Sequence, residues 1–131
     1  MNLFNNVKIR YFGCIAVIIS LTFVFVGGVC AENVKSQQYL NRLSSNKIEV
    51  KILAAKEITK SGVADAILFD EIEKQLLQNY IRKDLTFNEI DLFSWYCRDL
   101  SSSGLTKYQA TLEKVADESS YIKIKHYAKQ G

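Results

Sequence analysis

From Lys47 onward, apolar residues recur at intervals of three and four, the spacing that places them on one face of an α-helix. The chain contains no proline, the residue that most often breaks such helices. The pattern predicts five helices within residues 47–131, and no strand-rich arrangement accounts for it. The residues expected to face inward are, helix by helix, Ile48, Ile52, Ala55 and Ile58; Phe69, Ile72, Leu76 and Tyr80, with Leu68 and Leu77 widening this stripe; Ile90, Phe93, Cys97 and Leu100; Tyr108, Leu112 and Val115; and Tyr121, Ile124 and Ala128.

Capping residues mark where three of these helices begin. Thr86 and Glu89 are spaced as a capping box, in which each side chain accepts a hydrogen bond from the other's backbone N–H. Asn46 and Asp65 are placed to cap two earlier helices. The last helix, residues 120–129, is the least regular, because its first residues also alternate as a strand would.

Two of the predicted helices end at Ser-Gly sequences, which contain Gly62 and Gly104. Glycine suits a helix end because it adopts the left-handed conformation without strain. Apolar positions repeat at the interval that separates these glycines or one residue later, as in Ile48 with Ile90, Ala55 with Cys97, Ile58 with Leu100, Phe69 with Leu112, and Ile72 with Val115. A period of about 42 with two antiparallel helices per unit is the spacing of HEAT-like repeats.

The stretch Trp95-Tyr-Cys-Arg-Asp-Leu-Ser-Ser-Ser-Gly104, continued by residues 107–115 and 125–129, resembles bacterial HEAT-like repeat proteins. Residues 52–62 are similar to a preceding unit, so the resemblance spans roughly 47–131. It implies an all-α fold, a short α-solenoid of about two and a half helical hairpins that binds other proteins and lacks catalysis. The proline common in the first helix of a HEAT unit is missing here.

Stacked repeats bury their apolar faces only against neighbours. The fifth helix is therefore expected to cap one end of the stack. The other end, formed by the first helix and the preceding linker, would leave apolar surface for a partner or for a second copy. By analogy with the family, the concave face of the second helices would be the contact surface.

Residues 1–31 have the composition of a secretory signal peptide. The segment up to Gly13 carries two basic residues and no acid, and residues 14–26 are uncharged. Val29 and Ala31 then supply small side chains three and one places before a cut after Ala31. Residues 32–46 are predicted to be a polar linker, in which Val34, Leu40 and Leu43 could form a short helical turn that packs on the body, and residues 47–131 the helical domain.

Two alternatives to cleavage remain open. The apolar stretch Phe12–Val29 is near the lower length limit for a retained membrane anchor. Acylation of Cys30 would make a lipoprotein, although Val29 stands where that processing requires Gly, Ala or Ser. With either a cleaved or a retained leader, the basic start holds the N-terminus in the cytoplasm and places the body outside it. We expect an extracytoplasmic location, the periplasm in a Gram-negative bacterium, or anchoring in the inner membrane.

The charge balance gives no reason to expect a nucleic-acid partner. The chain has 17 Lys and Arg against 14 Asp and Glu, and Lys8 and Arg10 leave with the leader, so the mature protein carries an excess of one positive charge. Membrane contact is expected only through an uncleaved leader. The expected partner is an unidentified protein or a second copy of the chain.

No residue is predicted to be catalytic, to bind a cofactor or to ligate a metal. His126 is the only histidine and lies among Lys123, Lys125 and Lys129, which disfavours metal binding. Cys97 is the one cysteine left after cleavage, and its place on an apolar stripe predicts burial rather than nucleophilic attack.

The remaining polar and aromatic candidates also have structural explanations. The acidic groups Asp70-Glu71-Glu73 and Glu89-Asp91 fall in first helical turns, where they complement the helix dipole. Trp95-Tyr96 is expected to fill the gap between helices rather than to line a ligand groove. The sequence therefore predicts an exported, non-catalytic protein-binding or adaptor module; the alternative is a membrane-anchored helical accessory protein that retains its leader.

Intact-mass analysis of the protein from its native cell separates these two predictions. Cleavage after Ala31 gives a protein that begins at Glu32 and leaves the membrane fraction in high salt. A mass that includes residues 1–31, with the protein retained in the membrane fraction at high salt, would contradict cleavage and favour the anchored alternative.

Overall fold

The computed structural model describes residues 31–131, and within this range its regular secondary structure is helical, with no strand; the predicted leader lies outside it except for Ala31. The prediction of an all-α fold is confirmed. Residues 31–43 are helical. The elements that follow are α2 (Ile48–Ser61), α3 (Ala66–Asn79), α4 (Phe87–Ser102), the short 3₁₀ helix η1 (Thr106–Tyr108), α5 (Gln109–Glu118) and α6 (Ile122–Ala128).

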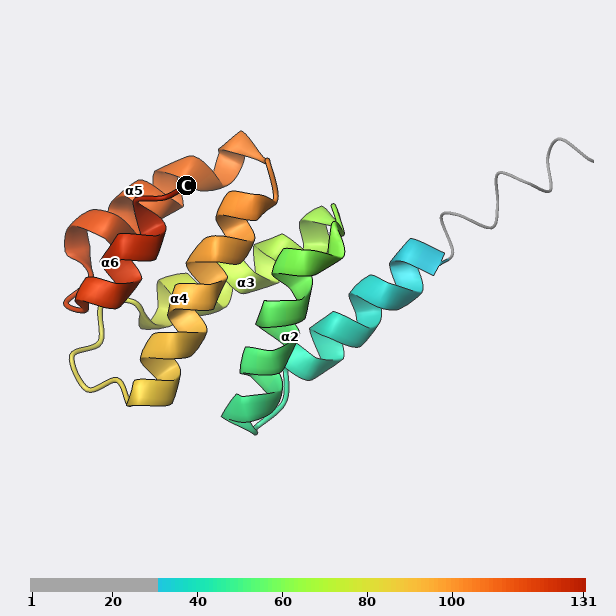
Figure 1. Ribbon diagram of the computed structural model, residues 1–131, viewed down its shortest axis with the longest axis horizontal. Coiled ribbons are helices and arrows are strands. Elements are labelled where there is room, and N and C mark those ends of the chain that lie inside the picture. The colour runs from blue at the N-terminus through green and yellow to red at the C-terminus, as the bar shows by residue number, and fades with distance from the viewer. Residues whose placement is uncertain (1–30) are drawn as a thin grey trace, which may run out of the picture. The chain divides into compact units, whose positions relative to one another are not determined.

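The helices of residues 48–128 form two layers (Figure 1). In the first layer α4 packs between α2 and α6. In the second layer α3 contacts α5, and these two helices pack chiefly on α4 and α6 respectively. Successive helices therefore alternate between the layers.

The two helix ends that carry the repeated Ser-Gly sequence are built alike. Gly62 and Gly104 have φ angles of 66° and 68°, the left-handed conformation that glycine tolerates. In both places the serine before the glycine donates to a carbonyl three residues back and accepts from the N–H two residues on. The four bonds are Ser61 Oγ to Ile58 O at 2.8 Å, Val63 N to Ser61 Oγ at 3.2 Å, Ser103 Oγ to Leu100 O at 2.6 Å, and Leu105 N to Ser103 Oγ at 3.2 Å.

Two of the three predicted helix starts are confirmed. Thr86 accepts a hydrogen bond from the Glu89 N–H at 3.3 Å, and Glu89 accepts from the Thr86 N–H at 2.7 Å, which completes the capping box. Asp65 accepts from the Ile67 N–H at 2.9 Å at the start of α3.

The third predicted start, Asn46, is wrong. The residue that precedes α2 is Lys47, and it makes no side-chain capping bond. The Lys47 N–H instead donates to Ser45 Oγ at 3.2 Å. This local turn carries the chain past Asn46 before the helix begins.

The polar linker predicted at residues 32–46 is also wrong, because this segment is helical up to residue 43. Tyr39 and Leu43 are buried in the core. Arg42 forms a bidentate ion pair with Glu57 of α2, with N–O distances of 2.5 and 3.0 Å. Tyr39, Leu40 and Leu43 lie on one face of this helix and pack against the core, whereas Val34 is exposed, so the polar composition of the segment concealed how far the helix extends.

The predicted inward residues do form the core. All are buried except Ile48, Ile90 and Tyr121, which are partly buried and pack against it, and Leu77, which was expected to widen the stripe of α3 but is 38% exposed. Residues 122–128 are helical, so the strand alternative for this segment is wrong. Ile124 is fully buried and Ile122 is 86% exposed, so these two isoleucines lie on opposite sides of α6.

One carboxyl group, that of Asp99, is fully buried between α4 and α2. Its Oδ1 lies 2.5 Å from the hydroxyl of Thr59, and its Oδ2 has no hydrogen-bond partner within residues 31–131. Burial raises the pKa of Asp99 well above its usual range, and the bond to Thr59 and the charge of Arg98 only partly oppose this. A protonated Asp99 can donate to Thr59, whose own hydroxyl then donates to the Ala55 carbonyl at 3.3 Å.

Because the pKa of Asp99 is raised in the folded state, protonation of its carboxyl stabilises the fold. This stabilisation is complete at pH values below the pKa of Asp99 in the unfolded chain. It is lost as the pH rises through the folded-state value. We expect Asp99→Asn to match the unmodified protein near pH 4 and to exceed its free energy of unfolding at pH 8 by about 1–3 kcal/mol, since the variant buries no charge. Urea unfolding at a series of pH values measures this difference. An equal pH dependence in both proteins would contradict it.

Candidate functional site

The neighbouring residues Trp95 and Tyr96 of α4 differ in burial. Tyr96 points inward, is fully buried and donates a hydrogen bond to Gln75 Oε1 at 2.9 Å. Trp95 is only half-buried. The expectation that these rings fill the space between helices therefore holds for Tyr96 and in part for Trp95, which packs against the core and leaves the rest of its ring at the surface.

Trp95 has cationic neighbours from two helices. The ammonium of Lys56, on α2, lies 5.6 Å from the centroid of the indole ring. The guanidinium of Arg98, one turn further along α4, lies 4.5 Å from it. The same guanidinium is 5.4 Å from the ring centroid of Tyr127, on α6. Lys56, Trp95, Arg98 and Tyr127 thus join the three helices of the first layer, and we call this group the Trp95 face.

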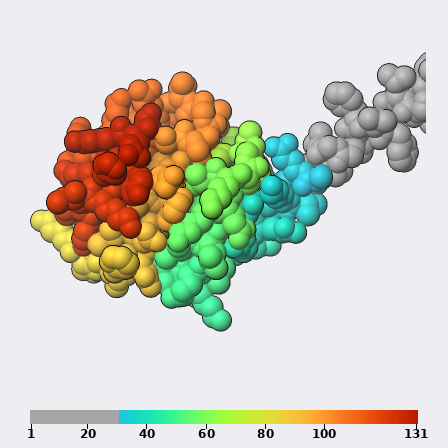
Figure 2. Space-filling view, in the orientation of Figure 1, coloured from blue at the N-terminus to red at the C-terminus, as the bar shows by residue number. Residues whose placement is uncertain are grey.

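The three helices that carry the Trp95 face form a continuous surface (Figure 2). Within residues 31–131, neither Lys56 nor Arg98 forms an ion pair, whereas nearby Lys123 is paired with Asp91 at 2.6 Å. The two cations are held beside aromatic rings instead, an attraction worth about 0.5–2 kcal/mol for each contact. The face therefore presents positive charge that no carboxylate of the described residues neutralises.

Lys56 and Arg98 occupy equivalent places in the sequence repeat, since their spacing equals that of Gly62 and Gly104. Leu53 stands at the same interval from Trp95 and is 55% exposed. Each of α2 and α4 therefore carries a large apolar residue followed three residues later by a cation. This shared pattern is the sequence signal that would have indicated the face, and it is not a catalytic motif.

The second layer differs, because polar groups of α3 are bonded to η1 and α5. Asp70 accepts from Lys107 at 2.5 Å and from the Tyr108 hydroxyl at 2.8 Å, and Thr111 donates to Glu73. Lys107, followed by Tyr108, lowers the pKa of Asp70. These acidic side chains connect the second-layer helices and do not converge on a cleft.

Cys97 lies in the core rather than in a reactive site. The side chain is fully buried, and burial, with a smaller effect of nearby Asp99, raises the pKa of the thiol to about 12. A thiol with so high a pKa is scarcely ionised at neutral pH and is a poor nucleophile.

His126 is exposed on α6, where its Nε2 lies 2.9 Å from the Gln130 amide nitrogen. Within residues 31–131, no group of three His, Cys, Asp or Glu side chains is arranged to hold a metal ion. Of the basic residues near the C-terminus, Lys123 is paired with Asp91, and Lys125 donates to the Asp117 carbonyl at 2.8 Å.

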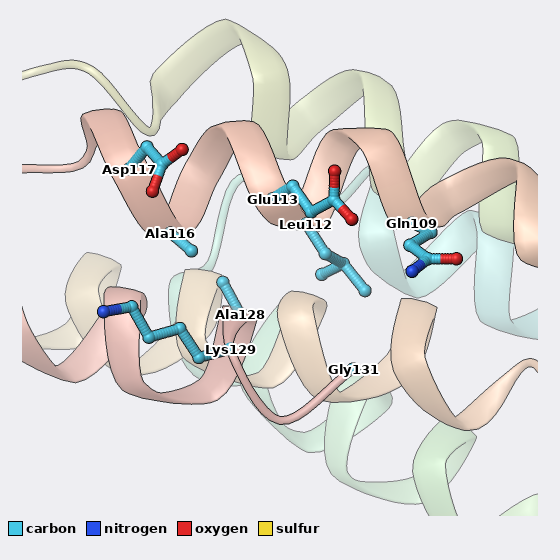
Figure 3. Close-up of a pocket in the computed structure, with 8 residues that line it drawn as sticks. All are labelled: Gln109, Leu112, Glu113, Ala116, Asp117, Ala128, Lys129 and Gly131. Atoms are coloured by element: carbon cyan, nitrogen blue, oxygen red, sulfur yellow. The ribbon is translucent and has the colours of Figure 1, made fainter.

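A groove of about 410 Å³ lies between α5 and the end of α6 (Figure 3). Leu112 and Ala116 point from α5 toward α6, and Ala128 faces them from α6. The charged groups at its edge, Glu113, Asp117 and Lys129, do not converge on one point. A small-molecule site needs a few polar groups aimed at the same ligand, and this groove does not provide them. Its lining is Gln109, Leu112, Glu113, Ala116, Asp117, Ala128, Lys129 and Gly131.

No family model matches the chain, and no curated protein or solved structure shows significant similarity to it. Among residues 31–131, no helix is both long and apolar enough to cross a bilayer. The Trp95 face is therefore identified from its geometry and charge.

The burial of Cys97 is open to a direct chemical test. We expect iodoacetamide at pH 8 to leave Cys97 unmodified in the native protein and to alkylate it fully in denaturant, because the native thiol is both inaccessible and protonated. Peptide mass spectrometry locates the modification. Rapid alkylation of Cys97 without denaturant would contradict the structure of the α4 core.

Proposed function

We propose that this chain is an exported, non-catalytic protein-binding module of HEAT-like construction, and that the Trp95 face is its contact surface. The observation that carries the proposal is the set of Lys56, Trp95, Arg98 and Tyr127, held together across three helices with the two cations unpaired within residues 31–131.

The composition of the face supports a protein partner. Tryptophan, tyrosine and arginine are the residues that most often dominate the binding energy of protein interfaces. Here their positions are fixed by helices rather than by loops, so little conformational entropy is lost on binding. Exposed Leu53 extends the face along α2 with further apolar area.

The stacking of the helices supports the HEAT-like part of the proposal. The matching bonds at the Gly62 and Gly104 helix ends, and the side-by-side packing of α2 and α4 that carry them, support a repeated helical unit. Proteins built in this way use broad helical surfaces for recognition.

The environments of Cys97 and His126 support a non-catalytic role. Cys97 is a buried, protonated thiol on α4, while His126 is an exposed side chain on α6 that contacts Gln130. Export is supported by the composition of residues 1–31. In the alternative proposal, a membrane-anchored accessory protein with its leader retained, the same face would contact a partner beside the membrane.

A variant of the central ring tests the contact surface. We expect Trp95→Ala to weaken partner binding by about thirtyfold or more, the loss of about 2 kcal/mol typical of a central interface tryptophan. The measurement is crosslinking in the native cell with a tag on a flexible spacer after Gly131, followed by quantitative mass spectrometry.

Two further variants make this result specific. Arg98→Gln removes the charge and retains the ring, so it reports on the face even if Trp95→Ala lowers stability. Lys114→Gln is the matched control, because Lys114 is an exposed cation on α5 in the other layer. A set of crosslinked proteins that is the same for all three variants and the unmodified chain would overturn the proposed contact surface.

A further inference from the structure

We infer that the Trp95 face binds an acidic segment of its protein partner, with the guanidinium of Arg98 receiving a carboxylate. This inference rests on the proposed function and adds the chemistry of the partner to it.

The side chain of Arg98 is restricted by contacts with two aromatic rings. Its guanidinium lies beside two rings, 4.5 Å from the Trp95 centroid and 5.4 Å from that of Tyr127. These contacts restrict a side chain that otherwise has many rotamers, so less entropy is lost when it binds a ligand. Within residues 31–131, its N–H groups have no hydrogen-bond acceptor, although Arg98 is half-buried. A carboxylate accepts two parallel hydrogen bonds from such a fork, and this pairing is among the strongest that side chains make.

Lys56 provides a second positive charge on the neighbouring helix α2, and Trp95 lies within cation–π distance of both cations. Packed helices lie about 8–10 Å apart, and an extended chain advances about 3.3 Å per residue. An extended partner segment that crosses α4 and α2 would therefore reach both cations with acidic residues about three positions apart. An apolar residue between them would lie on the indole ring of Trp95.

The geometry favours an acidic protein segment over an anionic membrane. A tryptophan that anchors a protein in a bilayer must extend its ring into the interface. Trp95 is half-buried on the side of a helix, between cations from α2 and α4. Lys123 of α6 is already neutralised by Asp91 of α4.

The sequence contains a single tryptophan, so intrinsic fluorescence reports directly on the proposed site. The probe is N-acetyl hexaglutamate, titrated to about 5 mM against the full protein, since a short peptide of this kind is expected to bind with a millimolar dissociation constant. We expect a saturable change in Trp95 emission that weakens as the salt concentration rises. N-acetyl hexaglutamine, which has the same length without the charge, should produce no change.

Variants assign the response to the two cations. Arg98→Gln and Lys56→Gln should each weaken hexaglutamate binding by about five- to tenfold, because each removes one charged contact. Lys114→Gln should bind as the unmodified protein does. Undiminished binding by Arg98→Gln, or no response to hexaglutamate in the unmodified protein, would overturn the inference.

Failure of the inference can be told apart from failure of the proposed function. If hexaglutamate has no effect but Trp95→Ala still abolishes crosslinking to a protein partner, the face binds protein without requiring acidic residues. If Trp95→Ala also leaves crosslinking to the partner unchanged, the proposed contact surface itself is wrong. If vesicles containing phosphatidylglycerol change Trp95 emission and the peptide does not, the face binds an anionic membrane and the acidic-segment inference fails.

Discussion

The packing of α4 is the constraint on which the rest of the structure depends. This helix contacts α2 and α6 on either side and both helices of the second layer, so it buries residues over much of its circumference. Tyr96, Cys97 and Leu100 fill the space between the layers and are almost completely removed from water. A helix buried to this extent has few exposed positions, and the character of its outward side chains consequently determines what the first layer presents to solvent.

The same packing explains why the buried carboxyl of Asp99 lies close to the exposed Trp95 face on this helix. Asp99 points into the contact with α2, where it meets Thr59, and burial keeps the carboxyl protonated over an extended pH range. Arg98, the preceding residue, points outward and rests between Trp95 and Tyr127. Adjacent residues of one helix thus serve two functions, the internal contact with α2 and the cationic surface, because they differ by about 100° in direction.

The two layers differ in how their charges are neutralised. In the second layer, acidic residues of α3 accept hydrogen bonds from Lys107, Tyr108 and Thr111, so these charges hold elements of the stack together. In the first layer, Lys56 and Arg98 lie against an aromatic ring and have no carboxylate among residues 31–131. Lys123 and Asp91 do pair within the first layer, so the reason for placing the proposed contact surface there is the unpaired Lys56 and Arg98 beside Trp95, although analogy with HEAT-like proteins had indicated the second helices.

The sequence by itself determined the helical class, most of the helix boundaries and most of the core. The capping box of Thr86 and the glycine ends at Gly62 and Gly104 involve bonds within four residues, so they can be recognised without knowledge of the fold. The tertiary structure alone decided that residues 35–43 form a continuous helix rather than a short turn, that Asp99 is buried against Thr59, and that Lys56, Trp95, Arg98 and Tyr127 meet. Those contacts join different helices, and which side chains meet depends on the order and alignment in which whole helices stack, which no local pattern encodes.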